Sequence, residues 1–269
     1  MSTEQGSRWS SVRDYLDETN ERDLALNLLL PFVILVGWEI GAWAGLINTQ
    51  FFPAPSAILG VAGQMLADGS LVHNTLVSLG RIIPAFVVAS AFGIVTGLLM
   101  GWSSRIDTII DPIVSALYPL PKVVLLPIIF LIFGLNDLSR MVALGAAVYL
   151  LVTINTVGGA RQVEEAYLEA ARDNGASGYR MIREVIFPAS LPHIFSGLSL
   201  AMGISFILIV VVEMVAAQSG LGYIIWNSWN LFTIKKMYVA VITINVLGIV
   251  FTYGIEAVGS YLTRWQERI

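Results

Sequence analysis

The chain has 269 residues, of which 56% are hydrophobic and 13% are charged, and its mean hydropathy is +0.76. A soluble domain carries about a quarter charged residues, so this composition excludes an ordinary soluble protein and indicates a protein that resides in lipid. The chain has no cysteine, which excludes disulfides and thiolate metal sites, and its net charge of −4 predicts no nucleic-acid partner. We expect no secretory signal in residues 1–23, because this segment is polar.

Six apolar segments are long enough to cross a bilayer, which requires about 20 predominantly apolar residues. They are residues 24–47, 82–102, 112–135, 141–160, 191–217 and 237–262. The third segment contains Pro119, Pro121, Lys122 and Pro127, and we expect the helix to be broken there. The sequence therefore predicts an all-α membrane protein with six transmembrane helices.

The basic residues predict which side of the membrane each loop occupies. With six spans both termini lie on one side, and ten arginines fall on that side against Arg140, Lys235 and Lys236 on the other. Arg81 and Lys122 are assigned to neither side. Because loops rich in Arg and Lys stay in the cytoplasm, we expect cytoplasmic termini, segments 1–23 and 263–269, and a cytoplasmic loop at 161–190.

One external segment and one glycine stripe have predictable roles in packing. In the external segment, residues 48–73, Ser56 is placed to cap a short amphipathic surface helix. In the second span Gly93, Gly97 and Gly101 share one helix face. Small residues let helix backbones approach closely in lipid, so we expect this face to pack against another helix of the same chain.

The loop at 161–190 is the longest charged, helix-prone stretch of the chain. We expect a first helix over residues 164–174 that ends at Asn174-Gly175, and a second helix that Ser177 caps and Pro188 breaks. Such a helix pair is suited to a groove on another protein. The alternative is a solvated connector, although connectors of about 30 residues are uncommon.

This loop also carries a motif. Glu169-Ala170-Ala171 is followed by Gly175 and then by VIFP at residues 185–188. The spacing resembles the EAA motif of ABC-importer permeases, in which a glycine follows the second alanine by four residues and I-x-L-P comes later. Val and Phe replace the Ile and Leu of that pattern, and both keep an apolar side chain.

Three further segments extend the likeness over about residues 51–232. They read FFPAPS (51–56), YPLPKVVLLPIIFLIFG (118–134) and EMVAAQSGLGYII (213–225). Together they resemble the nitrate, sulfonate, bicarbonate and taurine branch of the binding-protein-dependent ABC permeases. The resemblance implies a five-helix permease core at 74–262, preceded by one extra span at 24–47.

The resemblance also implies a role for the loop and a set of partners. In this family the loop is a coupling helix that docks on a cytoplasmic ATPase subunit, so Glu169, Ala170, Ala171, Gly175 and Pro188 are the expected coupling residues. The expected assembly has two permease copies, two ATPase subunits that hold ATP and Mg²⁺, and an external solute-binding protein, in a bacterial inner membrane. This chain has no phosphate-binding GxxxxGK[ST] loop, and we expect it to be a transport subunit without a bound cofactor and not an enzyme.

Three residues are candidates for the translocation path, namely Pro121, Lys122 and Glu213. A charge inside a bilayer costs at least about 2.5–3.5 kcal/mol and must therefore face protein or water. Lys122 at a proline-broken helix is suited to attract an anionic solute. The structural alternative is that Lys122 snorkels or pairs with Glu213, for which a structural pair is the favoured role.

Two other classes of protein are alternatives to the importer interpretation. An ion-coupled secondary transporter commonly has repeated halves with matching broken helices, and here only the third span contains such a break. A membrane scaffold without transport activity is the other alternative. The histidines and carboxylates show no metal-ligand spacing, and we expect no metal site.

Overall fold

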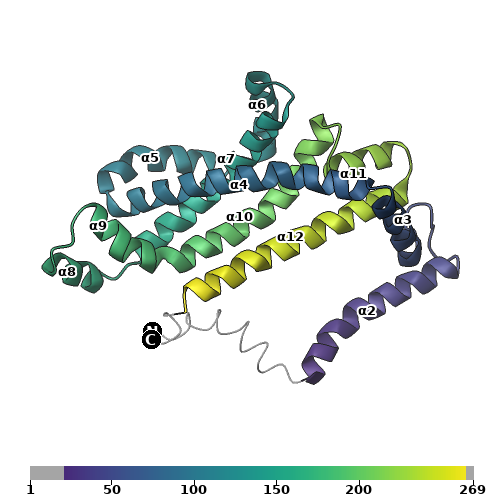
Figure 1. The fold of residues 1–269 in the computed structure, drawn as a ribbon, viewed down its shortest axis with the longest axis horizontal. Helices are drawn as coiled ribbons and strands as arrows, with labels where there is room; N and C mark the ends of the chain where they lie inside the picture. The colour runs from purple at the N-terminus through teal and green to yellow at the C-terminus, as the bar shows by residue number, and fades with distance from the viewer. Residues whose placement is uncertain (1–20, 265–269) are drawn as a thin grey trace.

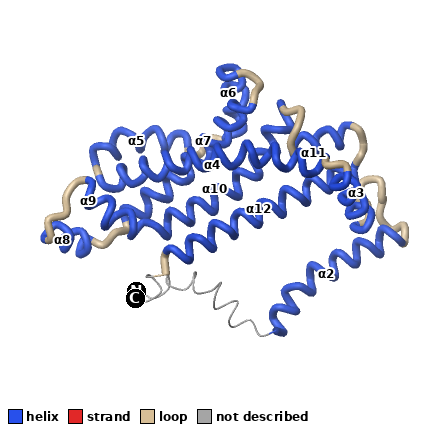
Figure 2. Tube along the Cα trace, in the orientation of Figure 1, coloured by secondary structure: helices blue, strands red, loops and turns tan. Residues whose placement is uncertain are grey.

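The computed structural model of the protein describes residues 21–264, and every regular element in that range is a helix (Figures 1 and 2). The elements are α2 (Glu21–Trp43), α3 (Pro55–Ala67), α4 (Ser70–Trp102), α5 (Ser104–Leu117), the 3₁₀ helix η1 (Lys122–Leu125), α6 (Leu126–Phe133), α7 (Asp137–Arg161), α8 (Glu165–Asp173), α9 (Tyr179–Met181), the π-helix η2 (Ile182–Ile186), α10 (Phe187–Ala216), α11 (Leu221–Asn230) and α12 (Ile234–Leu262). The predicted all-α fold is confirmed. The predicted terminal segments lie largely outside the described residues.

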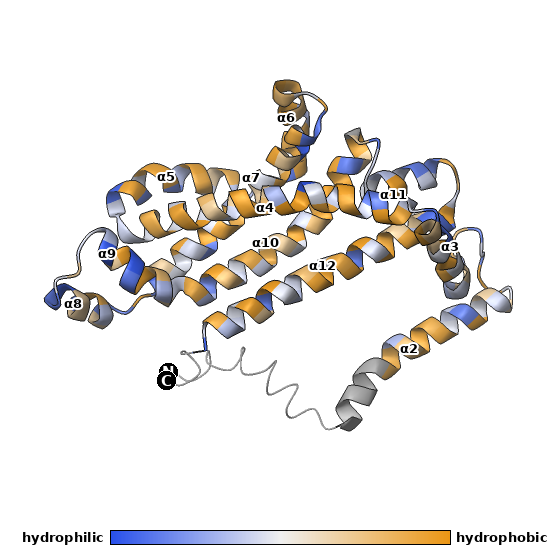
Figure 3. Ribbon diagram, in the orientation of Figure 1, coloured by the Kyte–Doolittle hydropathy of each residue, from blue (hydrophilic) through white to orange (hydrophobic). Residues whose placement is uncertain are grey.

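Four long helices, α4, α7, α10 and α12, lie side by side and form the body of the molecule (Figure 1). Their shared core consists of small and branched apolar side chains, among them Val152, Ala201, Ile209 and Val212. Figure 3 shows that these helices are largely apolar, whereas hydrophilic residues gather around α8 and α9 at one end. An apolar bundle with one polar end is the arrangement expected of a protein that crosses a membrane.

The helices agree with most of the predicted spans. Four continuous helices of the described chain are long and apolar enough to cross a membrane, and their bounds are 70–102, 137–161, 179–215 and 234–262. They contain the second, fourth and sixth predicted spans and all but the last two residues of the fifth. The helix containing the second span begins twelve residues before that span, at Ser70 rather than Ile82, because the residues that precede the apolar run continue the same helix.

The predicted third span is a bent pair of helices. Helix α5 and the η1–α6 segment meet at an angle of 95°, on either side of the turn at Pro119 and Pro121. Helix α6 extends away from the four-helix body (Figure 1). The predicted break is confirmed, since proline removes a backbone donor and prevents a straight helix through this segment.

The predicted first span corresponds to α2, which diverges from the body of the molecule (Figure 1). The whole helix has 23 residues, and Leu29–Trp43 is the apolar part among the residues whose side chains the structure describes. Trp38 anchors this helix on α12, where its ring lies 5.9 Å from that of Tyr238. The crossing of the membrane by this segment stays a prediction.

The predicted cap of the external helix is wrong in its details. The helix α3 begins at Pro55, and Ser56 lies within its first turn and does not cap it. Instead, the carboxylate of Glu39 accepts hydrogen bonds from the backbone N–H of Ser56 at 3.0 Å and from its hydroxyl at 2.6 Å. A carboxylate near a helix N-terminus is favoured by the helix dipole, and here it joins α2 to α3.

Two predictions about the loop at 161–190 are also wrong. Gly178, and not Ser177, precedes the second helix, and no side chain caps that helix. Pro188 does not break it, because α9, η2 and α10 form one continuous helix over residues 179–215. The chain accommodates Pro188 by widening to a π-helix at Ile182–Ile186, immediately before the proline.

Candidate functional site

Helix α8 extends from the polar end of the bundle and is held there by a small apolar cluster (Figure 1). The buried members of this cluster are Leu98, Ala160, Met181 and Ile186, and the partly buried members include Val163, Leu168, Ala171 and Ala176. These side chains come from α4, α7, α8, α9, η2 and the turns beside α8. The helix therefore contacts the bundle through the partly buried Leu168 and Ala171.

The alanine pair of the motif divides between the two faces of α8. Ala171 packs into the apolar cluster, whereas Ala170 and Glu169 are exposed on the opposite side. Glu169 and Ala170 are therefore both accessible from outside the bundle.

The turn after α8 requires a glycine. Gly175 has a φ of +81°, and the backbone N–H of the next residue, Ala176, donates to the carbonyl of Ala171 at 2.9 Å. A Cβ at Gly175 would meet no atom within 4 Å, so the constraint comes from the backbone conformation alone. Asn174 donates from its side chain to the Ala170 carbonyl at 2.7 Å. The predicted helix stop at Asn174-Gly175 is confirmed.

The glycine stripe of α4 lies against α7. A Cβ at Gly93 would lie 3.1 Å from the carbonyl oxygen of Tyr149, and one at Gly97 would lie 2.5 Å from the Cβ of Thr156. A Cβ at Gly101 would collide with Ala160. The predicted packing of this face within one chain is confirmed, because the two backbones are too close for a larger residue.

Lys122 lies at the bend between α5 and α6, directly after Pro121. Its ammonium group donates to the backbone carbonyl of Tyr118 and lies 5.2 Å from the centroid of the Tyr118 ring. The alternative pairing of Lys122 with Glu213 is wrong. Lys122 instead stabilises the turn that breaks the helix, and its cation remains on the surface of the described chain.

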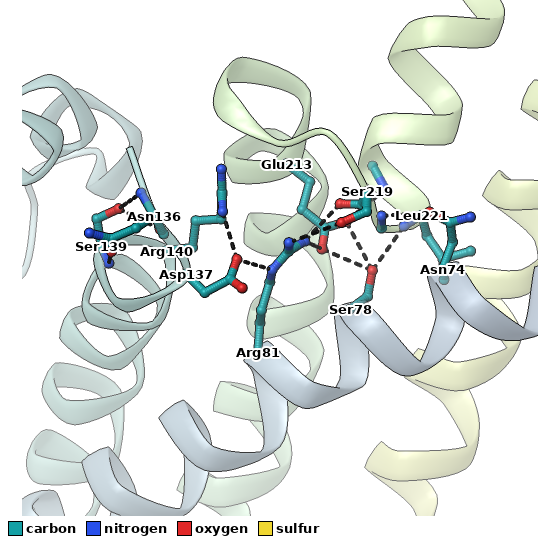
Figure 4. Close-up of polar contacts among 12 residues, drawn as sticks. Asn74, Ser78, Arg81, Asn136, Asp137, Ser139, Arg140, Glu213, Ser219 and Leu221 are labelled. Atoms are coloured by element: carbon teal, nitrogen blue, oxygen red, sulfur yellow. Dashed lines mark hydrogen bonds and ion pairs between the residues drawn. The ribbon is translucent and has the colours of Figure 1, made fainter. Parts of the chain in front are cut away.

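Glu213 is completely buried near the end of α10 (Figure 4). Its carboxylate accepts hydrogen bonds from Arg81 at 2.6 Å, from the Ser78 hydroxyl at 2.9 Å and from the backbone N–H of Gly222 at 2.9 Å. The expected structural pair is therefore present, with a different partner. A buried carboxylate with this many donors is well satisfied and fixes the elements around it.

Arg81 and Asp137 are members of this cluster that the sequence reasoning missed. Arg81 is 4% exposed and also donates from Nε to Asp137 at 2.9 Å. The available signal was its position next to an apolar span, where a charge requires an opposite charge. We considered Lys122 as the partner of Glu213. The true partner, Arg81 on α4, is distant from Glu213 in the sequence and approaches it only when α4 packs against α10.

Within residues 21–264, no group of three or more His, Cys, Asp or Glu side chains is placed to hold a metal ion. The polar cluster around Arg81 consists of hydrogen bonds and ion pairs between side chains and backbone groups of α4, α7, α10 and the turn before α11. Its geometry is suited to fixing helices in position.

Comparison with known proteins identifies the family. Residues 89–265 match the family described as "Binding-protein-dependent transport system inner membrane component". The chain belongs to this family. The matched range contains α5–α12 and the glycine stripe, so both the broken span and the exposed α8 are features of a permease domain.

The curated relatives cover nearly the whole permease. It is 31% identical over 245 residues to a probable ABC transporter permease protein of Brucella abortus, with 91% of this chain and 97% of that protein covered. It is 28% identical to the taurine transport system permease protein TauC of Escherichia coli, with 92% of each covered. It is 29% identical to the bicarbonate transport system permease protein CmpB of Synechococcus elongatus, with 98% and 96% covered.

Solved structures agree with this fold. An amino acid ABC transporter chain matches with a TM-score of 0.57 at 19% identity, covering 75% of this permease and 96% of that chain. An inward-facing MetNI methionine ABC transporter chain matches with a TM-score of 0.55, also at 19% identity, covering 71% and 95%. The family and the relatives together show that the chain is a multi-pass permease subunit of an ABC importer.

Proposed function

We propose that this permease moves a small anionic solute through the membrane when a separate ATPase subunit pushes on α8. The observation that carries this proposal is the exposed face of Glu169 and Ala170 on a helix whose other face is packed into the bundle. A rigid contact transmits a displacement that a flexible loop would absorb. Glu169 supplies a charge for a polar contact, Ala170 permits close approach, and Gly175 permits the turn. Ala171 and Pro188 hold α8 and the helix that follows it.

The proposed assembly follows from the family. Two permease copies, a homodimer in our proposal, associate with two cytoplasmic ATPase subunits and with a binding protein on the external face. ATP and Mg²⁺ are held by the ATPase subunits and not by this chain. Both termini and α8 face the cytoplasm of a bacterial inner membrane, and α3 and α11 lie on the external side in contact with lipid. The uneven distribution of arginine supports this orientation.

The proposed class of solute rests on the relatives and on Lys122. The relatives are named for the transport of taurine, aliphatic sulfonates and bicarbonate, which all carry an oxyanion. Lys122 places a cation at the break of the α5–α6 span, on the surface that the second permease copy would enclose. Pro121 holds this lysine at the bend. A cation in such a pathway favours the entry of an anion.

Uptake by the reconstituted complex tests this function. The permease is placed in lipid vesicles with its ATPase and its binding protein, and uptake of labelled taurine, an alkanesulfonate and bicarbonate is measured with and without ATP. We expect ATP-dependent uptake of one oxyanion. Uptake driven by an ion gradient without the ATPase would contradict the proposal.

Two matched variants test the role of the lysine. Lys122→Gln is expected to lower oxyanion uptake by about tenfold or more, which corresponds to about 1.4 kcal/mol of lost transition-state stabilisation. Lys235→Gln removes the same charge from the exposed start of α12 and is expected to leave uptake unchanged. Equal rates for wild type and Lys122→Gln, at equal amounts of folded protein, would remove Lys122 from the translocation path.

A further inference from the structure

One guanidinium group connects three separate parts of the molecule. Arg81, on α4, donates from Nη1 to Glu213 on α10 at 2.6 Å and to the carbonyl of Ser219 at 2.8 Å, and from Nε to Asp137 on α7 at 2.9 Å (Figure 4). Only arginine has donors that reach several acceptors at fixed angles. The proposed transport function assigns no role to this arrangement.

On one side, Arg81 belongs to a clamp on the start of α11. The backbone N–H groups of Gly220, Leu221 and Gly222 donate to Asn74, Ser78 and Glu213, at 2.7, 2.9 and 2.9 Å. These are the N–H groups that a helix start leaves without partners inside the helix. The turn before α11 is therefore fixed to α4 and α10, and it has little freedom to move by itself.

On the other side, Arg81 reaches the base of α6. Asn136 caps α7 by accepting from the backbone N–H of Ser139 at 3.0 Å, and its side chain also donates to the carbonyl of Phe133 at 2.6 Å. The single residue Asn136 thus joins the last residue of α6 to the first turn of α7. Asp137 follows directly, so its bond to Arg81 ties this junction to α4 and α10.

The two ion pairs of Arg81 differ in their exposure to solvent. The side chain of Glu213 is 0% exposed, whereas that of Asp137 is 59% exposed and also binds Arg140 at 2.6 Å. Breaking a buried pair leaves an unpaired buried charge, which is costly, whereas a solvated carboxylate can release its partner at a small cost. The Arg81–Glu213 contact is thus the permanent one, and the Arg81–Asp137 contact is the one that can open.

From these contacts we infer that Arg81 is a positioning residue that couples the turn before α11 to the base of α6. The inference rests on the proposed function, in which α11 lies on the face that receives the binding protein and the α5–α6 bend lies on the solute pathway. With the Arg81–Asp137 contact closed, a displacement of α11 moves α6. With it open, the two elements move independently.

Asp137→Asn removes the charge from the Arg81–Asp137 pair and leaves the bonds of Arg81 to Glu213 and to the Ser219 carbonyl in place. In vesicles containing the permease, its ATPase and its binding protein, the basal ATPase rate and the unfolding temperature are expected to match the wild type. The stimulation of the ATPase by loaded binding protein is expected to fall about fivefold or more, which is the usual lower limit for coupling between sites. Asp137→Glu retains the charge and is expected to restore most of the stimulation.

Asp68→Asn is the matched control. Asp68 is exposed before α4, and hydrogen bonds from Ser70 hold the pKa of its carboxyl below its usual range, so the variant removes one full negative charge. It touches neither Arg81 nor α6, and its stimulation is expected to equal the wild type. Equal losses in both variants would assign the effect to external charge and would overturn the inference. Full stimulation of the ATPase in Asp137→Asn would also overturn the inference. So would a fall of the basal ATPase rate and of the unfolding temperature that is as large as the fall in stimulation.

A distance measurement separates the failure of this inference from a failure of the proposed function. The chain has no cysteine, so spin labels can be attached to single cysteines introduced at Trp229 and Leu131, which are 49% and 87% exposed. Labelled permease is mixed with an excess of unlabelled, cysteine-free permease, so that a proposed homodimer carries one labelled copy. In its complex with the ATPase and without the binding protein, we expect one narrow distribution of label distances in the wild type and a broader one in Asp137→Asn. Equal widths would overturn the coupling. A wild-type ATPase that loaded binding protein does not stimulate would overturn the proposed function, whatever the widths.

Discussion

At the scale of single residues, the fold depends on positions where no other side chain fits. Gly97 of α4 is such a position, because a Cβ there would lie 2.5 Å from the Thr156 Cβ and 2.8 Å from the carbonyl oxygen of Thr153. The backbone of α7 has to shift to accept it. We predict that Gly97→Ala destabilises the permease by about 1–3 kcal/mol, the usual cost of an overpacked core.

The same helix supplies the control for this prediction. A Cβ at Gly80 would meet no atom within 4 Å, and Ala is the better helix former, so Gly80→Ala is expected to leave the permease as stable or more stable. Thermal unfolding of both variants in detergent decides the question. A Gly97→Ala variant as stable as Gly80→Ala would show that α4 and α7 are not packed this closely.

The buried Glu213 is a second residue whose replacement has a predictable effect on stability. Glu213→Gln replaces an acceptor of three donors with a group that is itself a donor at one end, and it leaves the buried Arg81 with the solvent-exposed Asp137 as its remaining ion-pair partner. We predict a loss of about 3–5 kcal/mol, the usual result of breaking a buried pair. Glu256→Gln is the control, because the partly buried Glu256 accepts from Ser199 and a glutamine oxygen can still accept that bond. Comparable unfolding temperatures for the two variants would contradict this account of Arg81 and Glu213.

At the scale of elements, α8 is the part of the chain that carries the proposed contact with the ATPase. We predict that Glu169→Lys lowers ATP-driven uptake by about tenfold or more, corresponding to about 1.4 kcal/mol, without changing the unfolding temperature. The variant reverses an exposed charge on the outer face and touches nothing in the bundle. Gly175→Asp is expected to uncouple hydrolysis from uptake in the same way, through strain in the turn at φ +81°.

Glu164→Lys controls for the charge change in Glu169→Lys. Glu164 is exposed directly before α8 and lies about 140° around the helix from Glu169, since each residue turns the helix by about 100°. Its uptake is expected to stay near that of the wild type. If both variants lost uptake equally, the net charge of the loop, and not the face of α8, would account for the result.

The elements also show what the sequence can and cannot predict. Apolar length predicted the helices around α4, α7, α10 and α12, and prolines predicted the bend at residues 118–121, because both signals are local. The same local reasoning failed at Pro188, where a π-helix absorbs the proline. It also failed at Ser56, because the cap comes from Glu39 on another helix.

The candidate site divides along the same line. The helix stop at Gly175 is predicted by the local Asn-Gly sequence, and the role of Glu169 is predicted by the EAA motif. The partner of Glu213 does not, because Arg81 lies 132 residues earlier and only the packing of α4 against α10 brings the two side chains together. Likewise, the motif does not indicate that Ala170 faces outward while Ala171 faces the bundle.

At the scale of the whole molecule, the structure has two unlike ends. One end carries α8, and the other carries α3 and α11 (Figure 1). An apolar cluster holds α8, and the polar cluster around Arg81 holds the start of α11. The four long helices connect these ends, so a displacement of α8 can be transmitted to the other end through rigid elements. In the proposed assembly α8 faces the cytoplasm, where the ATPase subunits would bind it.

The sidedness of α8 is the most direct test of that account. A single cysteine at Glu169 is introduced into the cysteine-free chain and exposed to a membrane-impermeant maleimide, in inside-out and in right-side-out vesicles. We predict labelling in inside-out vesicles alone, and protection from the label when the ATPase subunit is bound. Labelling in right-side-out vesicles, or equal labelling with and without the ATPase, would contradict the claim that α8 is the contact through which the motor drives this permease.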